Sequence, residues 1–99
     1  MSVETLKPIH PGEVLQEEFL KPFGLTDSEL AAGTHIQIDL IEKIASWQQS
    51  VTADVALRLA RFFGTSAHFW LGLQSDYDLD VAQIKIGKTL EKEIVPLAA

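Results

Sequence analysis

The sequence predicts an all-α protein of five to six short helices, and three observations support this fold class. Hydrophobic residues make up 46% of the 99 residues, enough for a core, and no cysteine is available for a disulfide framework. Apolar side chains recur every three to four residues in several stretches, which is the period of an amphipathic helix. Residues that favour helix starts and stops separate these stretches. A chain of this length suits one domain over residues 1–99.

The first helix is expected to begin at Pro11, because proline is favoured at the first helical position. Apolar side chains follow at near-helical spacing, at Val14, Leu15, Phe19 and Phe23. Pro22 and Gly24 are expected to end this helix.

A second helix is expected over about residues 27–32, and it has the clearest start signal in the sequence. Thr26 and Glu29 have the spacing of a capping box, in which each side chain accepts a hydrogen bond from the other residue's backbone N–H. Leu25 and Leu30 stand where a hydrophobic staple would join the two sides of the helix start. Such a helix has barely two turns, so tertiary packing must stabilise it.

A third helix is expected within residues 36–47, because their apolar side chains follow the helical period. These side chains are Ile36, Leu40, Ile41, Ile44 and Trp47. Isoleucine is β-branched and favours strands, so a strand is the alternative. The adjacent pair Leu40 and Ile41 breaks the alternation of a strand and therefore favours the helix.

The fourth helix is expected from Thr52, a good N-cap, to Phe63, with Gly64 as its stop. Arg58 and Arg61 face outward on this helix, and its inward-facing side chains are Val55, Ala56, Leu59, Ala60 and Phe63.

The last third of the chain is expected to form two more helices. Ser66 starts a helix that carries Phe69, Trp70 and Leu73, and Asp78 is a candidate cap for another that runs to Ile86. The pattern assigns no element to residues 87–99. The expected core comprises Leu15, Phe19, Leu30, Ile41, Ile44, Leu59, Phe63 and Trp70.

The charge is acidic and unevenly distributed. The net charge is −6, so the overall field does not attract nucleic acid. Residues 1–33 have a net charge of −4 and residues 67–99 of −2, whereas residues 34–66 are balanced. Any contact with nucleic acid is therefore expected from the middle third. The start lacks the pattern of a signal peptide and no apolar stretch approaches the roughly 18 residues of a membrane span, which predicts a cytoplasmic protein without a membrane partner.

No group of residues suggests catalysis. The histidines His10, His35 and His68 lie far apart and lack the i, i+4 spacing of a helical metal site, so a surface or capping role suits each. Asp76, Asp78 and Asp80 alternate as at the start of a calcium-binding loop. However, Val81 and Gly87 stand where that loop needs glycine and glutamate. The sequence predicts no enzyme, no cofactor and no metal.

The helices expected at 27–32 and 36–47 are separated by a turn of about three residues. Two short helices joined in this way have the geometry of a helix-turn-helix, whose second helix enters the major groove of DNA. Ordinary packing of two short helices is the alternative interpretation of this pattern alone.

Three longer motifs resemble a known family. Residues 10–20 read HPGEVLQEEFL, residues 52–66 read TADVALRLARFFGTS, and residues 69–74 read FWLGLQ, followed by YDL at 77–79. In this order and spacing they resemble the HigA-type antitoxins, also called VapI-like, of the Xre or lambda-repressor-like helix-turn-helix group. The resemblance extends from about residue 9 to residue 86.

The resemblance implies a lambda-repressor-like bundle with its helix-turn-helix at about 26–46. It also implies a homodimer formed by C-terminal helices at about 66–86, repression of the protein's own operator DNA, and a HigB toxin of the messenger-RNA-cleaving RelE-like type as partner. An acidic protein suits a basic nuclease, and the expected toxin-facing region holds Glu4, Glu13, Glu17, Glu18, Asp27 and Glu29. Together with the resemblance, a surplus of large apolar residues after Ser66 predicts that Phe69, Leu73, Tyr77 and Leu79 lie in or near the dimer interface, with ordinary core as the alternative for the aromatic residues.

The middle of the chain departs from the family pattern. His35 stands where the turn of the family usually has glycine, and Thr34 with Gln37 could cap the following helix. The usual arginines, lysines and glycines of the second helix and its loop are mostly absent, which leaves Lys43 as the one cation expected there. The candidate DNA-facing residues are Thr26, Ser28, Thr34, His35, Gln37, Ile38, Asp39, Glu42, Lys43 and Gln48. The alternative function is a dimeric interaction module that binds a toxin with weak or no DNA binding.

Overall fold

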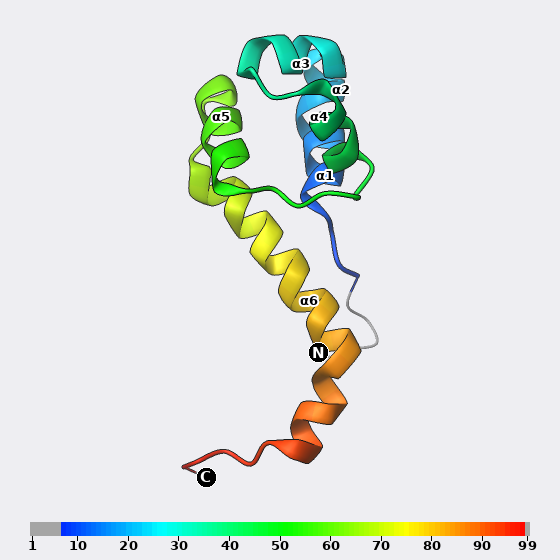
Figure 1. Cartoon of the computed structure of the whole chain (residues 1–99), viewed down its shortest axis with the longest axis vertical. Coiled ribbons are helices and arrows are strands. Elements are labelled where there is room, and N and C mark those ends of the chain that lie inside the picture. Colours follow the sequence, from blue (N-terminus) through cyan, green and yellow to red (C-terminus); the bar gives the residue numbers. More distant parts are fainter. Residues whose placement is uncertain (1–6, 99) are drawn as a thin grey trace.

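The computed structural model describes residues 7–98, and the elements of this part are all helical. In chain order they are α1 (Pro11–Val14), η2 (Leu15–Leu20), α2 (Lys21–Phe23), α3 (Asp27–Thr34), α4 (Ile38–Ala45), α5 (Ala53–Phe63) and α6 (Ala67–Glu93). The described residues contain no strand, and short loops join the helices (Figure 1). The all-α prediction is confirmed. None of these helices is both long and apolar enough to cross a membrane.

The segments α1, η2 and α2 form one continuous helix with a π-helical middle. The Lys21 N–H donates to the Gln16 carbonyl five residues back. Proline cannot donate this backbone bond, and its ring collides with the carbonyl four residues back in an α-helix. The wider π turn directly before Pro22 relieves that collision, so the helix continues to Phe23. Gly24, with φ of 63°, then ends it as expected.

Three of the predicted N-caps, Thr26, Thr52 and Ser66, are confirmed. The Glu29 N–H donates to Thr26 Oγ1 at 3.1 Å, and the Thr26 N–H donates to Glu29 Oε1 at 3.0 Å, which completes the capping box. Thr52 and Ser66 cap α5 and α6 in the same way, through the N–H groups three residues further on. These bonds satisfy donors that the first turn of a helix otherwise leaves free.

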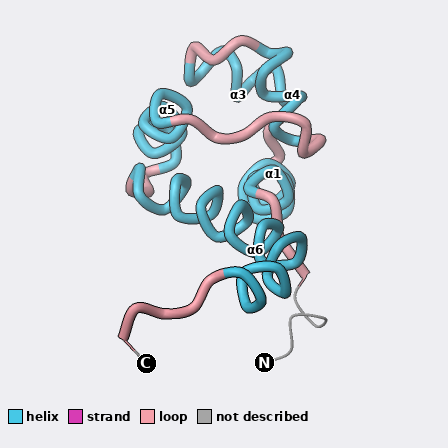
Figure 2. The backbone as a smooth tube through the Cα atoms, turned by 60° about the horizontal axis from the view of Figure 1, so that its bottom comes forward, coloured by secondary structure: helices cyan, strands magenta, loops and turns pink. Residues whose placement is uncertain are grey.

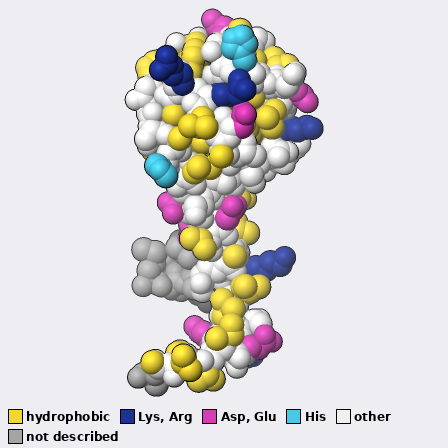
Figure 3. Space-filling view, turned by 60° about the vertical axis from the view of Figure 1, so that its left-hand side comes forward, with side chains coloured by type: hydrophobic (Ala, Val, Ile, Leu, Met, Phe, Trp, Pro, Cys, Tyr) yellow, Lys and Arg dark blue, Asp and Glu magenta, His cyan; other side chains and the backbone are white. Residues whose placement is uncertain are grey.

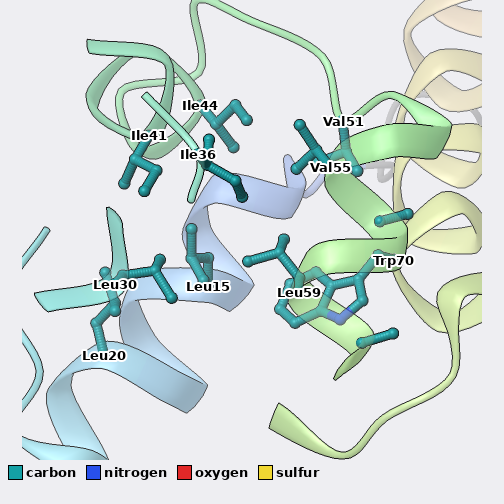
Figure 4. Close-up of a cluster of buried hydrophobic side chains, with 12 residues drawn as sticks. Leu15, Leu20, Leu30, Ile36, Ile41, Ile44, Val51, Val55, Leu59 and Trp70 are labelled. Carbon is teal, nitrogen blue, oxygen red and sulfur yellow. The ribbon is translucent and has the colours of Figure 1, made fainter. Parts of the chain in front are cut away.

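The core lies between the helices of the first 75 residues and is dominated by aliphatic side chains (Figure 4). Six of the eight predicted core residues are at most 2% exposed: Leu15, Leu30, Ile41, Ile44, Leu59 and Trp70. Phe19 and Phe63 are half-buried and pack against this cluster, with their ring centroids 4.7 Å apart. The indole N–H of Trp70 donates to Thr65 Oγ1 at 2.8 Å, so the buried ring has no unpaired donor.

The C-terminal third differs from the expectation of two helices, because α6 is one helix of 27 residues. Asp78 does not begin a new helix; its carboxylate instead accepts a bond from the Gln74 amide one turn earlier, at 2.9 Å. Aspartate and glycine inside a helix each lower its stability by only about 1 kcal/mol or less relative to alanine, so neither ends it here. The helix also continues to Glu93, in a segment to which the sequence pattern assigned no element.

The first part of α6 packs on α5 and α1, and the rest extends away from the bundle (Figures 1 and 2). The extents are 51 × 24 × 21 Å and the radius of gyration is 16.4 Å. A compact chain of this length has a radius of gyration of about 13 Å. The projecting part of α6 accounts for the difference.

Candidate nucleic-acid interface

The helices α3 and α4 pack against each other as a helix-turn-helix within the predicted range. Their apolar faces are fixed by the core, since Leu30 of α3 and Ile41 and Ile44 of α4 are almost fully buried. Burial of these side chains leaves the opposite face of α4 on the surface. The capping box and the Leu30 anchor thus orient α3, and α3 in turn supports α4.

The turn between the two helices keeps a left-handed residue although it lacks glycine. His35 has φ of 58° and ψ of 28°, and its N–H donates to the Ala31 carbonyl at 2.9 Å. Histidine tolerates this region better than most side chains do. Histidine therefore replaces the expected glycine at this position, while the backbone of the turn keeps its left-handed residue.

Thr34 corrects the sequence-based expectation in two respects. It is the last residue of α3 rather than a cap of α4, and the N-cap residue Gln37 makes no side-chain bond there. Thr34 is also buried. Its hydroxyl donates to the Leu30 carbonyl at 2.7 Å and accepts from the Ile36 N–H at 3.3 Å, so its polar atoms are paired inside the protein. The Thr34 side chain stabilises the turn from inside and is not available at the surface.

The other nine candidate residues lie on the surface. Each of them is exposed: Thr26, Ser28, His35, Gln37, Ile38, Asp39, Glu42, Lys43 and Gln48. Five of these come from the start and outer face of α4, and Thr26 and Ser28 come from the start of α3. The Thr26 hydroxyl is shared, since it also belongs to the capping box. The outer face of α4 combines neutral, acidic and basic groups, and Lys43 is its single cation.

Arg58 of α5 is a second cation near the turn, and the sequence analysis missed it. Its Nη1 donates to the Thr34 carbonyl at 3.1 Å and its Nε donates to Asp54 Oδ1 at 2.6 Å. The guanidinium therefore sits at the C-terminal end of α3, where a cation is favoured by the helix dipole. Lys43 is the one cation of α4 and of the loop that follows it, and Arg58 adds a second cation from α5. The sequence signal was only the i, i+4 spacing of Asp54 and Arg58, which does not reveal the reach to α3.

Arg58 and Arg61 line an open groove of ≈ 610 Å³ between the end of α3 and α5. Gly33 and His35 contribute one side of this groove, and Leu57 and Phe62 of α5 are exposed within it. Figure 3 shows basic and hydrophobic side chains together on the side of the bundle that it displays. A Cβ atom at Gly33 would meet the Phe62 ring at 2.3 Å, so this glycine lets α3 approach α5 closely.

The sequence predicted that Trp47 belongs to the apolar stripe of the third helix, and this prediction is wrong. The helix α4 ends at Ala45, and Trp47 has φ of 67° in the left-handed region. Its N–H donates to the Ile44 carbonyl at 3.0 Å, and the Gln48 N–H donates to the Lys43 carbonyl at 2.7 Å. These two bonds form a Schellman motif, in which the left-handed residue is usually glycine. Trp47 is 47% exposed and lies in the loop rather than in the core.

His10 is buried and has the capping role that the sequence suggested. Its Nδ1 accepts from the Gly12 N–H at 2.9 Å at the start of α1. Burial lowers the pKa of His10, against opposing effects of the Asp78 charge and a backbone hydrogen bond with Gln49. The imidazole is therefore held in its neutral form, which the bond to Nδ1 requires. Gly12 itself lies against α4, since a Cβ there would meet the Ile44 carbonyl oxygen at 2.0 Å.

The four residues predicted for the dimer interface occupy one helix, α6, but differ in exposure. Phe69 is 39% exposed and Leu79 is 65% exposed, whereas Leu73 and Tyr77 are half-buried. Further apolar side chains beyond Leu79 are also exposed, at Val81, Ile84, Ile86 and Leu90. Hydrophobic side chains follow one another along the narrow projecting part of the molecule (Figure 3). Val81, Ile84 and Ile86 fall within the range 66–86 expected for dimerisation, and Leu90 lies beyond it.

Asp76, Asp78 and Asp80 lie inside α6 rather than in a loop. Within residues 7–98 there is no group of three or more histidine and acidic side chains that could hold a metal ion. The three aspartates add negative charge to the part of α6 that leaves the bundle.

An all-α bundle whose α3 and α4 form a helix-turn-helix with an exposed second helix defines the class of helix-turn-helix regulators. No protein-family model matches the chain. Among curated proteins, it is 49% identical over 75 residues to virulence-associated protein I of Dichelobacter nodosus, covering 76% of this chain and 69% of that protein. It is 34% identical over 73 residues to antitoxin HigA-1 of Vibrio cholerae, covering 74% and 69%.

Among solved structures, the Pseudomonas aeruginosa antitoxin HigA with the higBA promoter has a TM-score of 0.89 and 44% sequence identity, covering 92% of this chain and 99% of that chain. The chain belongs to the HigA/VapI-type family of helix-turn-helix antitoxins.

Proposed function

We propose that this chain is a DNA-binding transcriptional regulator that acts as the antitoxin and autorepressor of a toxin–antitoxin pair. The observation that carries the proposal is the helix-turn-helix with α4 exposed, in a fold shared with an antitoxin that was solved with its promoter. Such complexes among its relatives favour DNA binding over the alternative of a toxin-binding module without DNA affinity.

The start of α4 supplies the base-reading groups. The Gln37 amide can make two hydrogen bonds to adenine, and Ile38 can contact a thymine methyl group. Asp39 and Glu42 can accept from cytosine amino groups, although their charges repel phosphates. Neutral side chains supply most of the proposed phosphate contacts, namely Thr26, Ser28 and Gln48. His35 and Lys43 add two more, and backbone N–H groups at the starts of α3 and α4 complete the set.

We propose a homodimer in which two copies of α6 pair through their exposed apolar side chains. A twofold pair uses the same patch on both subunits, so Phe69, Leu73, Tyr77 and Leu79 recur on each side. The exposed apolar side chains of the projecting part support this surface. Such a dimer presents two α4 helices to half-sites about 34 Å apart.

The proposed toxin partner is a basic, HigB-type ribonuclease of the RelE-like kind, met in the cytoplasm where the operator also lies. The acidic surface of the first helix and of α3 supports this choice, with Glu13, Glu17, Glu18 and Glu29 all exposed. Glu17 is paired with Lys21 at 2.7 Å, and Asp27 is half-buried. Glu4 lies outside the described residues. Acidic side chains steer a basic partner and cover its RNA-binding surface.

The test is a gel shift with the DNA upstream of the gene, at low and moderate salt. The expected result is a specific complex whose affinity depends weakly on salt, with about one to three ions released per subunit. The double substitution Gln37→Ala and Lys43→Ala is expected to abolish the shift, whereas Lys88→Ala on α6 serves as a charge-matched control. A folded dimer without operator affinity would contradict the proposal, and tight binding to random DNA that falls steeply with salt would contradict the placement of the interface on α4.

A further inference from the structure

The helix ends on either side of α4 differ from the other left-handed helix ends of the described chain. Four residues in this part have positive φ: Gly24, His35, Trp47 and Gly64. The two glycines end the first helix and α5, where the conformation is unstrained. His35 precedes α4 and Trp47 follows it, and for a residue as bulky as tryptophan this conformation is a clear outlier. Strain of this kind persists only where the surrounding structure imposes it.

At Trp47, the surrounding contacts are aromatic. The Trp47 ring stacks on the His10 ring, with centroids 6.0 Å apart and planes 13° apart. The edge of the His10 ring meets the Tyr77 ring of α6, with centroids 4.9 Å apart and planes at 76°. His10, Trp47 and Tyr77 form what we name the ring junction. It connects three segments that are distant in sequence: the start of α1, the loop after α4, and α6.

A second contact ties the other end of the same loop to the same stretch of α6. The Val51 N–H donates to Gln74 Oε1 at 2.8 Å, and Gln74 Nε2 donates to Asp78 Oδ1 at 2.9 Å. Val51 and Gln74 are both buried, so this bond is shielded from water. The short loop between α4 and Val51 is thus held at one end by His10, which itself contacts Tyr77, and at the other end by Gln74.

The loop is the part of the candidate interface that most depends on exact placement. It carries Gln48 and Gln49 and no charged side chain. A flexible lysine reaches a phosphate from many positions, but neutral amide donors make useful bonds only at the right distance and angle. Fixing the loop before DNA arrives also reduces the ordering entropy lost on binding.

We propose that Trp47 is a positioning residue for operator binding, held by the ring junction so that the loop presents Gln48 and Gln49 in one fixed place beside α4. The inference rests on the proposed DNA-binding function of the chain. Trp47 acts through the loop backbone. If Trp47 were merely the residue that ends α4, glycine would serve as well or better, because it adopts positive φ without strain and keeps both backbone bonds of the Schellman motif.

The test compares Trp47→Gly with Trp47→Phe in the full-length protein. Trp47→Gly removes the ring and relieves the backbone, so the thermal midpoint should stay within a few degrees of wild type. The Gln48 and Val51 N–H groups donate to the Lys43 carbonyl and to Gln74 Oε1. Their hydrogen exchange in the free protein should accelerate by roughly tenfold or more, because the loop opens locally. Operator affinity should fall by roughly tenfold, the effect of losing one or two neutral hydrogen bonds. Trp47→Phe keeps a ring against His10 and should recover most of both losses.

The possible outcomes separate the two ideas. If Trp47→Gly leaves loop exchange and operator affinity at wild-type values, Trp47 only ends the helix and the inference is overturned. If affinity falls only in proportion to a lowered thermal midpoint, the role is structural and the inference is also overturned. If wild-type protein does not bind the operator, the proposed function fails and Trp47 has no role in binding. Hydrogen exchange would then still decide whether the ring junction holds the loop.

Discussion

We call the described chain up to Tyr77 the head, and residues 78–93 of α6 the projecting part. The two regions differ in how far their apolar side chains are buried. The head buries a connected apolar core, in which Leu59 is 1% exposed and Trp70 is not exposed at all, although single apolar side chains such as Leu57 remain on its surface. The projecting part displays its apolar side chains: Leu79 is 65% exposed and Ile84 is 49% exposed. A single helix runs through both regions. The head therefore has a core of its own, whereas the exposed apolar side chains of the projecting part are the surface on which the proposed dimer rests.

Truncation of a buried side chain in the head should have the greatest effect on stability. Leu59→Ala should lower the free energy of unfolding by about 2–5 kcal/mol, because it removes a buried side chain and leaves a cavity. Chemical denaturation followed by circular dichroism measures this change. An unchanged denaturation midpoint would mean that α5 does not pack on the core as described.

Charged substitutions on the projecting part should affect self-association and leave the fold intact. The double substitution Leu79→Glu and Ile84→Glu should leave the head folded and weaken self-association by at least about tenfold, because four carboxylates would enter an apolar interface. Light scattering at tens of micromolar measures the mass, and circular dichroism checks the fold. A variant that remains dimeric would exclude the projecting part as the dimer interface.

Acidification should weaken the head through His10. Burial lowers the pKa of this imidazole, so the unfolded chain takes up the proton first as the pH falls. The stabilising contribution is complete above pH 6.5, the ordinary histidine value, and is lost as the pH falls from there toward the lower folded-state pKa. Protonation also removes the Nδ1 acceptor of the Gly12 N–H. Urea midpoints between pH 8 and pH 5 measure the effect, and His10→Gln should flatten this part of the profile. An identical profile in that variant would assign the pH dependence to other groups.

The smallest expected effect concerns one end of the helix-turn-helix. Thr26→Ala should cost about 1 kcal/mol, because the first turn of α3 loses its capping oxygen. Thr26→Ser keeps that oxygen and serves as the matched control in the same denaturation experiment. Equal losses in both variants would mean that packing of the threonine methyl group, rather than the cap, stabilises the start of α3.

Local signals in the sequence were sufficient for the helix starts. Thr26, Thr52 and Ser66 each lie before an apolar helical pattern, and each caps the helix that follows. Helix ends were harder, because two of them use left-handed residues that are not glycine. His35 and Trp47 both adopt that conformation. Trp47 also stacks on His10, a contact that exists only in the folded chain. The long α6 was divided at Asp78 for the opposite reason, since a local capping signal is present there but not used.

Part of the candidate site could also be inferred, and part could not. The outer face of α4 follows from the helical period once Ile41 and Ile44 are assigned to the core. The burial of Thr34 and the reach of Arg58 to its carbonyl depend on how α5 crosses α3, which is a tertiary property. The stack of Trp47 on His10 joins residues 37 positions apart, and neither the spacing nor the composition of the sequence indicates it.

The continuity of α6 has a mechanical consequence. From Tyr77 to Glu93 the helix rises about 24 Å without a break. A tilt of about 10° where Tyr77 meets His10 would therefore move its far end by about 4 Å. If two copies are clamped together along their projecting parts, the same tilt instead swings the two heads and changes the distance between their α4 helices. The helix then works as a lever arm, and its angle at Tyr77 sets which spacing of half-sites two heads can reach at once.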